Sequence, residues 1–308
     1  MLAPDPWAPG GVSAQRGCYQ GELFASSQIT VTTIECGADR RGALHVRTWD
    51  EPVIVLVRTG RFGRRIAGRC AVVDSTQGYV GHQGGEELIQ HLGYPGHRCT
   101  VLALRSEALP PLFRVRSRLV PTEFRTSPAT DLAHRRLLAE CRRGGDRAVI
   151  ADMAATLVAD LFAGWAQSSA SAHRVGTRAA TRHVVDIARE LVTTNSVPPS
   201  LQAVATAANI SPHYLTRVFR QSTGMTLSRY RNRVRVRLAL EMLAEEEGDL
   251  KLIAHDLGFF DHSHFSRIVM AEVGLSPRTL RRLLSVPSAA SFYPVAAAPI
   301  RPAVTRLA

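Results

Sequence analysis

Two segments of the chain repeat one pattern at a distance of fifty residues, and this repeat limits the fold more than any other feature. The segments are LTRVFRQSTG, which begins at Leu215, and FSRIVMAEVG, which begins at Phe265. Each opens with a large apolar residue, a small hydroxyl residue and an arginine, and each closes with a glycine seven residues after that arginine. A pattern that occurs twice predicts two copies of one supersecondary unit.

The residues around the first copy predict a helix, a tight turn and a second helix. Ser200 precedes the apolar pattern LQAVATAA, and its hydroxyl is suited to accept a hydrogen bond from a free amide of the first helical turn. Asn209 follows this helix and tolerates the left-handed backbone of a sharp turn. Ser211 is the expected N-cap of SPHYLTRVFRQ, and Pro212 stands where a missing N–H costs least. This is a helix-turn-helix pattern.

The second copy follows the same order. Asp249 begins the helix DLKLIAHDL, Gly258 supplies the turn, and Asp261 is the expected cap of DHSHFSRIVMAEV. The turn residues Asn209 and Gly258 are only 49 residues apart, whereas the caps Ser211 and Asp261 are 50 apart, so the second turn has one extra residue.

A long helix is expected between the two copies, in LSRYRNRVRVRLALEMLAEE. Tyr230, Val234, Leu238 and Met242 form an i, i+4 stripe that continues for three turns. The arginines of this segment are distributed around the helix, and we expect at most one or two of them to lie near phosphate: Arg229, Arg231, Arg233, Arg235 and Arg237.

The first half of the chain has a different pattern. Residues 44–104 contain short β-type runs separated by turn residues, which predict a small antiparallel barrel or sandwich. From Thr130 to about residue 166 the period becomes helical and predicts two amphipathic helices. Their apolar stripes exceed what two helices can bury on a small barrel, so we expect them to dimerise the protein through Leu132, Leu137, Leu138, Met153, Leu157 and Leu161.

The charge of the chain favours nucleic acid as a partner. The formal net charge is +12 at pH 7, and nearly all cations are arginines, since Lys251 is the only lysine. Arginine is suited to bidentate contacts with phosphate and guanine. The start of the chain has no signal-peptide pattern, and no segment approaches the roughly 20 apolar residues that cross a bilayer. We therefore expect a cytoplasmic protein with no membrane partner.

The five cysteines do not form a recognisable motif. All of them lie in the first half of the chain, and no two are spaced as C-x-x-C. Their number is odd, so the pattern supports neither a disulfide framework nor a zinc knuckle. We expect buried or free thiols at Cys18, Cys36, Cys70, Cys99 and Cys141. No pairing of a nucleophile with a base is found, so no catalytic residue is expected.

The C-terminal hundred residues resemble the DNA-binding domain of the AraC/XylS transcription regulators. The resemblance rests above all on IAHDLGFFDHSHFSRIVMAEVGLSPRTLRR, which contains I-A-x-x-x-G-F-x-D-x-S-x-F-x-R and, nine residues later, S-P at Ser276. It implies that residues of the first recognition helix face bases at His213, Thr216 and Arg217, with Arg220 beside phosphate. In the second helix it implies DNA contacts by His262, Ser263, His264, Ser266 and Arg267.

The second copy departs from this family in one place. The family usually has Phe followed by Lys or Arg after the arginine of each recognition helix, as at Phe219 and Arg220 in the first copy. The second copy has Val269 and Met270 instead, which predicts the loss of one aromatic core anchor and of one phosphate contact.

The first half resembles the sensor region of the same family, a cupin-like barrel followed by helices. The expected class is therefore α+β: an antiparallel cupin-like barrel with helices, then an all-α domain of two helix-turn-helix units joined by a long helix. The expected organisation is a disordered start (1–20), a sensor and dimerisation domain (21–167), a linker (168–176), a DNA-binding domain (177–285) and a disordered Pro/Ala tail (286–308).

The expected barrel is a candidate for a metal site, because enzymatic cupins bind a metal ion with inward His and Glu side chains. The histidines and glutamate considered were His82, Glu86, His91 and His97. The usual H-x-H followed by Glu is absent, so we expect neither a metal nor a cofactor.

The leading hypothesis is a transcription regulator, not an enzyme, whose two units read adjacent major-groove segments of promoter DNA and whose activity is modulated through the N-terminal domain. Its expected partners are double-stranded promoter DNA, RNA polymerase, a second copy in a homodimer and a small-molecule effector. Two alternatives stay open. One is a zinc-thiolate DNA repair alkyl-acceptor, which needs clustered cysteines, and the other is a non-specific architectural DNA binder.

Overall fold

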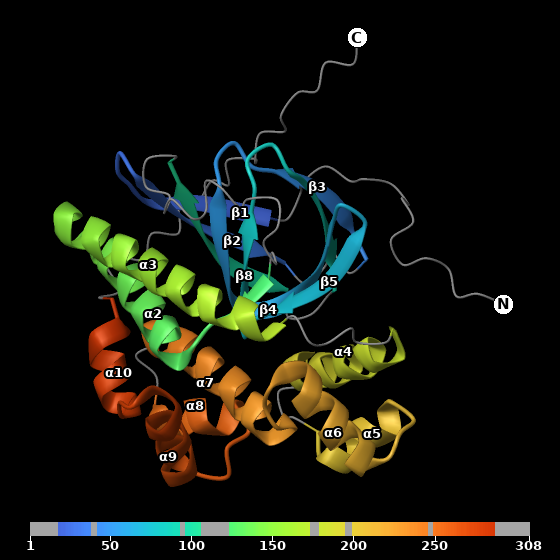
Figure 1. The fold of residues 1–308 in the computed structure, drawn as a ribbon. Coiled ribbons are helices and arrows are strands. Elements are labelled where there is room, and N and C mark those ends of the chain that lie inside the picture. The colour runs from blue at the N-terminus through green and yellow to red at the C-terminus, as the bar shows by residue number, and fades with distance from the viewer. Residues whose placement is uncertain are drawn as a thin grey trace. The chain divides into compact units, whose positions relative to one another are not determined.

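The protein consists of two units, which contacts between residues separate after Phe124. The computed structural model (Figure 1) describes residues 18–37, 42–92, 96–105, 123–172, 179–194, 199–245 and 249–286. The N-terminal unit is built from strands and the C-terminal unit, from Arg125, is built from helices. This confirms the α+β class. Disorder was expected at 1–20 and 286–308, and this is wrong for residues 18–20, which begin strand β1. Residues 1–17 and 287–308 fall outside the described residues.

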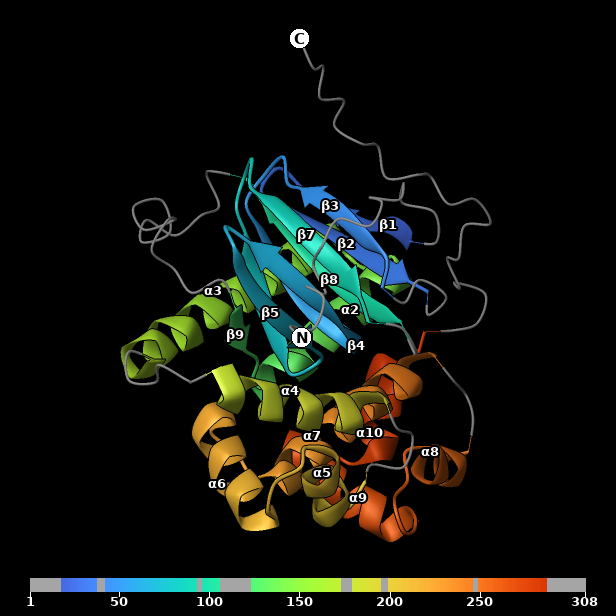
Figure 2. The same cartoon turned by 90° about the vertical axis from the view of Figure 1, so that its right-hand side faces the viewer.

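The N-terminal unit contains strands that pair antiparallel. Their bounds are β1 Cys18–Ala25, β2 Ile29–Cys36, β3 Leu44–Thr48, β4 Val53–Ile66, β5 Arg69–Asp74, β6 Gln77–Gly81, β7 Glu86–His91, β8 His97–Leu104 and β9 Glu123–Arg125. Strand β4, which has 14 residues, pairs with different strands along its two halves. Its first half pairs with β6 and β8, in the order β1-β2-β8-β4-β6. Its second half pairs with β5 and β7, and the order β3-β7-β4-β5 can be followed in Figure 2.

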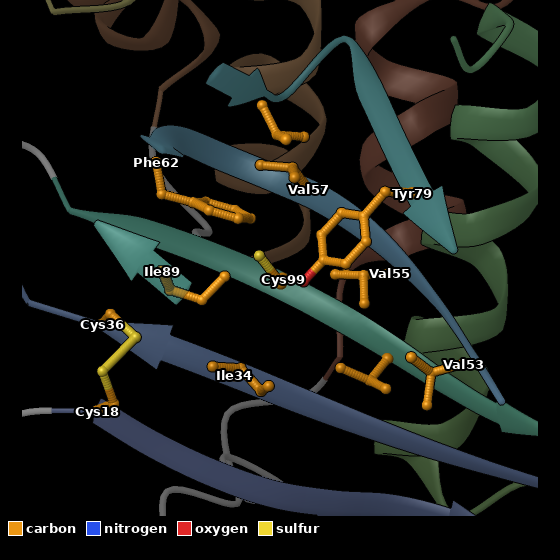
Figure 3. Close-up of a cluster of buried hydrophobic side chains, with 12 residues drawn as sticks. Cys18, Ile34, Cys36, Val53, Val55, Val57, Phe62, Tyr79, Ile89 and Cys99 are labelled. Atoms are coloured by element: carbon orange, nitrogen blue, oxygen red, sulfur yellow. A yellow bond between two sulfur atoms is a disulfide. The ribbon is translucent and has the colours of Figure 1, made fainter. Parts of the chain in front are cut away.

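An apolar core fills the space between these strands (Figure 3). Val55, Phe62, Tyr79 and Cys99 are fully buried. Since side chains alternate along a strand, such a core requires one face of every strand to be apolar. Burial in this core raises the pKa of the Cys99 thiol to about 12, so Cys99 is an inert thiol.

Arg64 is one of the fully buried charged residues of the same unit. Arg64 forms ion pairs with Glu87 at 2.8 Å and Glu123 at 2.9 Å, and its guanidinium lies 4.2 Å from the centre of the Tyr79 ring. A buried arginine is tolerated when carboxylates satisfy it in this way. The pair with Glu123 joins β9 to the rest of the sheet.

The expectation of buried or free thiols, with no disulfide, was wrong for two of the five cysteines. Cys18 and Cys36 stand opposite each other on β1 and β2, with Cα atoms 4.2 Å apart, and form a disulfide (Figure 3). Spacing along the chain hid this pair, because the register of two antiparallel strands brings residues 18 apart in sequence together. Cys70 is exposed, and Cys99 and Cys141 are buried free thiols.

The C-terminal unit contains two small cores that share one long helix. The helices are α2 Pro128–Arg143, α3 Arg147–Ala172, α4 Ala179–Thr194, α5 Leu201–Ala207, α6 Pro212–Thr223, α7 Leu227–Glu245, α8 Leu250–Asp256, α9 His262–Val273 and α10 Pro277–Leu284. The first half of α7 supplies Leu227, Tyr230 and Val234 to a core with α4, α5 and α6. The second half supplies residues 236–243 to a core with α8, α9 and α10.

Helices α2 and α3 are grouped differently from the expected domain boundary. The sequence placed residues 130–166 with the sensor domain and a linker at 168–176, but α3 continues to Ala172 and the contacts assign both helices to the C-terminal unit. Leu132 of α2 packs against the core around α9, and α2 contacts α7, α9 and α10. The expectation that these apolar stripes stay uncovered until a second copy binds is therefore wrong for most of their residues. Leu137 and Leu138 of α2 are 0% and 2% exposed, and Leu157 and Leu161 of α3 are 1% and 5% exposed.

None of the described helices is both long enough and apolar enough to span a membrane. The longest, α3, has 26 residues, but its sequence includes Asp152 and Asp160.

Candidate nucleic-acid interface

The first helix-turn-helix unit consists of α5, a turn over residues 208–211, and α6. The hydroxyl of Ser200 accepts a hydrogen bond from the Ala203 amide at 3.1 Å, and that of Ser211 accepts one from the Tyr214 amide at 3.2 Å. Asn209 has a φ of 52°, the left-handed conformation expected for the turn. These local contacts confirm the predicted caps and fix the entry of α6.

The outer face of α6 presents polar side chains on one stripe. His213, Thr216, Arg217 and Arg220 are exposed, whereas Leu215, Val218 and Phe219 on the opposite face are buried. With Gln221, the four polar residues line a surface hollow of about 530 Å³. The predicted residues of the first unit therefore lie together. Gln221 was missed, although its place four residues after Arg217 puts it on the same face.

Two contacts define how this stripe is held. The Thr216 hydroxyl donates to the carbonyl of Pro212 at 2.9 Å, which leaves its oxygen free to accept from a base or phosphate. The Arg217 guanidinium lies 5.3 Å from the centre of the Tyr214 ring, a cation–π distance that restricts where this long side chain points.

The second unit consists of α8, a longer turn and α9. Asp249 caps α8, and Asp261 caps α9 by accepting a hydrogen bond from the His264 amide at 2.6 Å. Gly258 has a φ of 67°, which matches the role of Asn209 in the first unit. The extra turn residue inferred from the spacing leaves Phe260 with 92% of its surface exposed.

The residues of α9 that were predicted to contact DNA differ in their exposure to solvent. His262, Ser263 and Arg267 are exposed, and Ser266 is half-buried. His264 is also half-buried: its ring packs edge-on against Phe259 at 5.6 Å, and its Nδ1 accepts a hydrogen bond from the Phe260 amide at 3.4 Å. These two contacts of His264 stabilise the turn. Phe260, which is exposed beside it, was not among the residues predicted from the sequence motif.

The comparisons with known proteins agree with this geometry. Residues 204–283 match the model of a family described as a helix-turn-helix domain. Over 80 residues the chain is 39% identical to the HTH-type transcriptional activator RhaS of Escherichia coli, including strain K12, which corresponds to 26% of this chain and 29% of RhaS. Residues 204–283 are an AraC-type helix-turn-helix domain.

Solved structures similar to the chain include an apo form of ToxT from Vibrio cholerae, at 12% identity and a TM-score of 0.38 over 85% of this chain and 99% of ToxT. They also include the DNA-binding domain of AdpA, a global transcriptional factor, in complex with a target DNA, at 19% identity and a TM-score of 0.31 over 32% of this chain and 90% of AdpA's. The chain spans only 29% of the length of the RhaS relatives that it matches.

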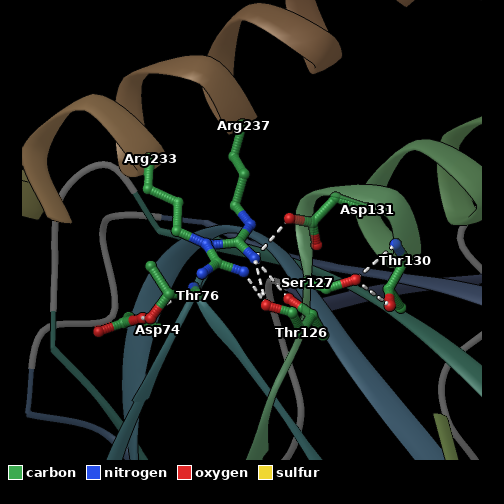
Figure 4. A network of polar contacts seen from close by, with 8 residues as sticks. All are labelled: Asp74, Thr76, Thr126, Ser127, Thr130, Asp131, Arg233 and Arg237. Atoms are coloured by element: carbon green, nitrogen blue, oxygen red, sulfur yellow. Dashed lines mark hydrogen bonds and ion pairs between the residues drawn. The ribbon is translucent and has the colours of Figure 1, made fainter. Parts of the chain in front are cut away.

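The arginines of α7 are mostly occupied inside the C-terminal unit. Arg235 donates to the carbonyl of Gly258 at 2.7 Å and lies over the Phe259 ring, so it holds the second turn. Arg237 pairs with Asp131 of α2, and Arg233 donates to the carbonyl of Thr126 (Figure 4). Burial lowers the pKa of Arg233 to about 10, and the nearby Arg237 adds to this shift. This agrees with the expectation that few of these arginines reach phosphate.

The second unit of the AraC-type domain has a different anchor beneath its recognition helix. Phe219 of the first unit packs edge-on against Tyr230 at 5.3 Å. Val269 occupies the corresponding place in α9 and is fully buried, and the aromatic contact comes instead from Phe259 and Phe265 at 5.2 Å. The expected loss of an aromatic core anchor is therefore offset by a neighbouring pair. Met270 is 47% exposed and offers no charge.

Proposed function

We propose that the protein is a transcription regulator that binds promoter DNA with sequence preference through both helix-turn-helix units. The observation that carries this proposal is the stripe of His213, Thr216, Arg217 and Arg220 on the exposed face of α6, lining one hollow. Histidine, threonine and arginine all hydrogen bond to base edges or phosphates, and arginine does so in a bidentate way with guanine. A helix that presents them together from a capped N-terminus suits the major groove.

The spacing of the two units supports the proposal that they reach successive stretches of one groove. Both recognition helices pack on α7, whose 19 residues correspond to a length of about 28 Å. Successive major-groove segments on one face of B-DNA lie about 34 Å apart. One chain would therefore read two adjacent segments without a two-fold partner.

The remaining roles belong to the same proposal. The N-terminal unit modulates DNA binding, a small-molecule effector supplies the signal, and RNA polymerase receives the output. The homodimer of this proposal uses the surface of α3 around Val149, which is 51% exposed, because α2 is covered by α7, α9 and α10 and Leu157 and Leu161 of α3 are buried. Sedimentation of the full chain at micromolar concentration tests the dimer, and a single monomeric species contradicts it.

The alternative of a DNA repair alkyl-acceptor is not favoured by the sulfur atoms. Such a reaction needs an accessible cluster of thiolates, whereas Cys18 and Cys36 are buried and joined, Cys99 and Cys141 are buried, and Cys70 is the one exposed cysteine of the described residues. The alternative of a non-specific architectural binder is tested by comparing the affinities of the protein for a selected DNA sequence and for an unrelated one.

The test is a selection of DNA from a random pool with the full chain, followed by titration of the selected duplex and of a shuffled duplex at one salt concentration. A specific regulator binds the selected duplex at least about a thousandfold more tightly. Equal affinities for the two duplexes would establish a non-specific binder and overturn the proposal.

A further inference from the structure

One end of the N-terminal unit gathers two cysteines and three histidines from five different strands. Cys18 begins β1, Cys36 ends β2, His45 lies on β3, His91 ends β7 and His97 begins β8. Their exposed fractions are 7%, 4%, 2%, 2% and 3%, so all five side chains are buried. The strand register explains the gathering, because Cys36 stands opposite both Cys18 and His97.

The ligand atoms of this group are close to one another. The sulfur atoms of Cys18 and Cys36 and one ring nitrogen of His91 all lie within 4.8 Å of one another. The Cys18 sulfur is 4.0 Å from His91 Nε2, and His91 Nε2 is 3.0 Å from His45 Nδ1. In a tetrahedral zinc site the usual bond lengths correspond to about 3.6 Å between sulfur and nitrogen and about 3.3 Å between two nitrogens.

A disulfide alone does not account for the histidines around it. Burying an imidazole in an apolar core is costly unless its nitrogens have partners. Among the described residues, His97 Nε2 has no hydrogen-bond partner, and the His97 ring lies 5.3 Å from that of His91 and 4.5 Å from that of Phe62. This end of the unit therefore holds a buried imidazole nitrogen that the described residues do not satisfy, next to the ring of His91.

We propose that Cys18 and Cys36 in their dithiol form, together with His91, bind one Zn²⁺ ion, with His45 as the fourth ligand. Thiolate sulfur and imidazole nitrogen are the donors that zinc prefers, and two of each in a tetrahedral arrangement is a common structural zinc site. The metal ties β1 and β2 to β7 and β3. The proposal does not depend on the DNA-binding function.

The disulfide and the zinc site exclude each other, because zinc binds the thiolates that the disulfide would join. Two equivalents of a low-molecular-weight thiol reduce the Cys18–Cys36 bond, which leaves two protein thiols and the oxidised reductant as its own disulfide. Zn²⁺ then binds with the release of two protons, one from each thiol. Two thiolates, two neutral imidazoles and Zn²⁺ carry no net charge together, which limits the cost of burying the ion.

The test measures zinc bound by the full chain, expressed without a polyhistidine tag. The protein is reduced with a monothiol, and the monothiol is then removed under anaerobic conditions. The reduced protein and an oxidised sample are both dialysed against zinc chloride and analysed for bound metal. Reduced protein is expected to hold about one zinc ion per chain and oxidised protein far less. Co²⁺ in place of zinc should give the absorption of a tetrahedral thiolate complex.

Variants separate this site from other ligands on the chain. Cys18→Ser and His91→Gln should each lower zinc affinity by at least about a hundredfold. The matched controls Cys70→Ser, at an exposed thiol, and His82→Gln, at a histidine of the β6–β7 turn, should bind zinc as the wild type does. His91→Gln retains the disulfide, so its fold is checked by circular dichroism in the oxidised form.

Two results would overturn the proposal. One is equal zinc content in reduced wild type and reduced Cys18→Ser. The other is the absence of the cobalt–thiolate absorption in reduced wild type, a measurement that involves no variant.

Discussion

Arg135 on α2 and Glu241 on α7 form an ion pair between side chains that are only 4% and 6% exposed. Removing one partner leaves the other charge buried without compensation. We predict that Arg135→Ala and Glu241→Ala each lower the free energy of unfolding by about 3–5 kcal/mol, measured by urea denaturation. The double variant Arg135→Met with Glu241→Leu should recover most of this loss, because apolar side chains of similar size need no partner.

The matched control for this pair is Arg142, which pairs with Glu245 at 4.0 Å from a half-exposed position. Arg142→Ala should cost at most about 1 kcal/mol. A loss at Arg135 no larger than the loss at Arg142 would mean that the buried pair does not hold α2 to α7.

The same contacts predict which fragment folds alone. A fragment from residue 177 lacks α2 and exposes Arg237 and Glu241, whereas a fragment from residue 125 retains Asp131 and Arg135 as their partners. We expect fragment 125–286 to unfold in one cooperative transition and to bind the selected DNA as the full chain does. Fragment 177–286 should unfold at markedly lower urea concentration. Equal midpoints for the two fragments would show that α2 is dispensable.

Met270→Lys tests the inequality of the two recognition helices. Met270 stands exposed where the first helix has Arg220, so a cation at this position is expected to add one phosphate contact. One such contact steepens the dependence of the logarithm of affinity on the logarithm of salt concentration by about one and tightens binding to all sequences alike. Titrations over a range of salt check this, with Met270→Gln as the uncharged control. An unchanged slope would contradict the inferred inequality.

Asn209 tests the backbone of the first turn. Its φ of 52° is a conformation that most side chains resist, at a cost of about 1–2 kcal/mol. Asn209→Val should therefore lower the free energy of unfolding by that amount, whereas Asn209→Gly should be close to neutral, as Gly258 is accepted in the second turn. Thermal or urea unfolding of both variants measures the difference, and a neutral Asn209→Val would refute the explanation.

Local signals in the sequence predicted the C-terminal helices well. Ser211 and Asp261 cap as expected, because a cap depends on residues three positions away, and Phe219 and Phe265 are fully buried, because helical period depends on neighbours. The contacts that were missed join distant parts of the chain. Cys18 with Cys36, and α2 with α7, depend on strand register and on helix packing, which no spacing in the sequence reports.

In the candidate site, too, the local features were predicted from the sequence and the contacts between separate elements were not. The sequence indicated which face of α6 is polar, and the structure places His213, Thr216, Arg217 and Arg220 around one hollow. The sequence pattern did not indicate that His264 is half-buried against Phe259, because this contact depends on how the second turn packs on α9. The site residues remain a prediction for DNA binding until they are tested on a duplex.

The most direct test is a scan of single base-pair substitutions across the selected duplex, titrated with wild type, Arg217→Ala and Arg267→Ala. The account predicts two groups of sensitive base pairs about 10 base pairs apart, each costing about 1–3 kcal/mol per substitution. Arg217→Ala should abolish sensitivity at positions in one group only, and Arg267→Ala at positions in the other. A single sensitive group, or two groups that both variants leave unchanged, would contradict the claim that α6 and α9 read the two segments.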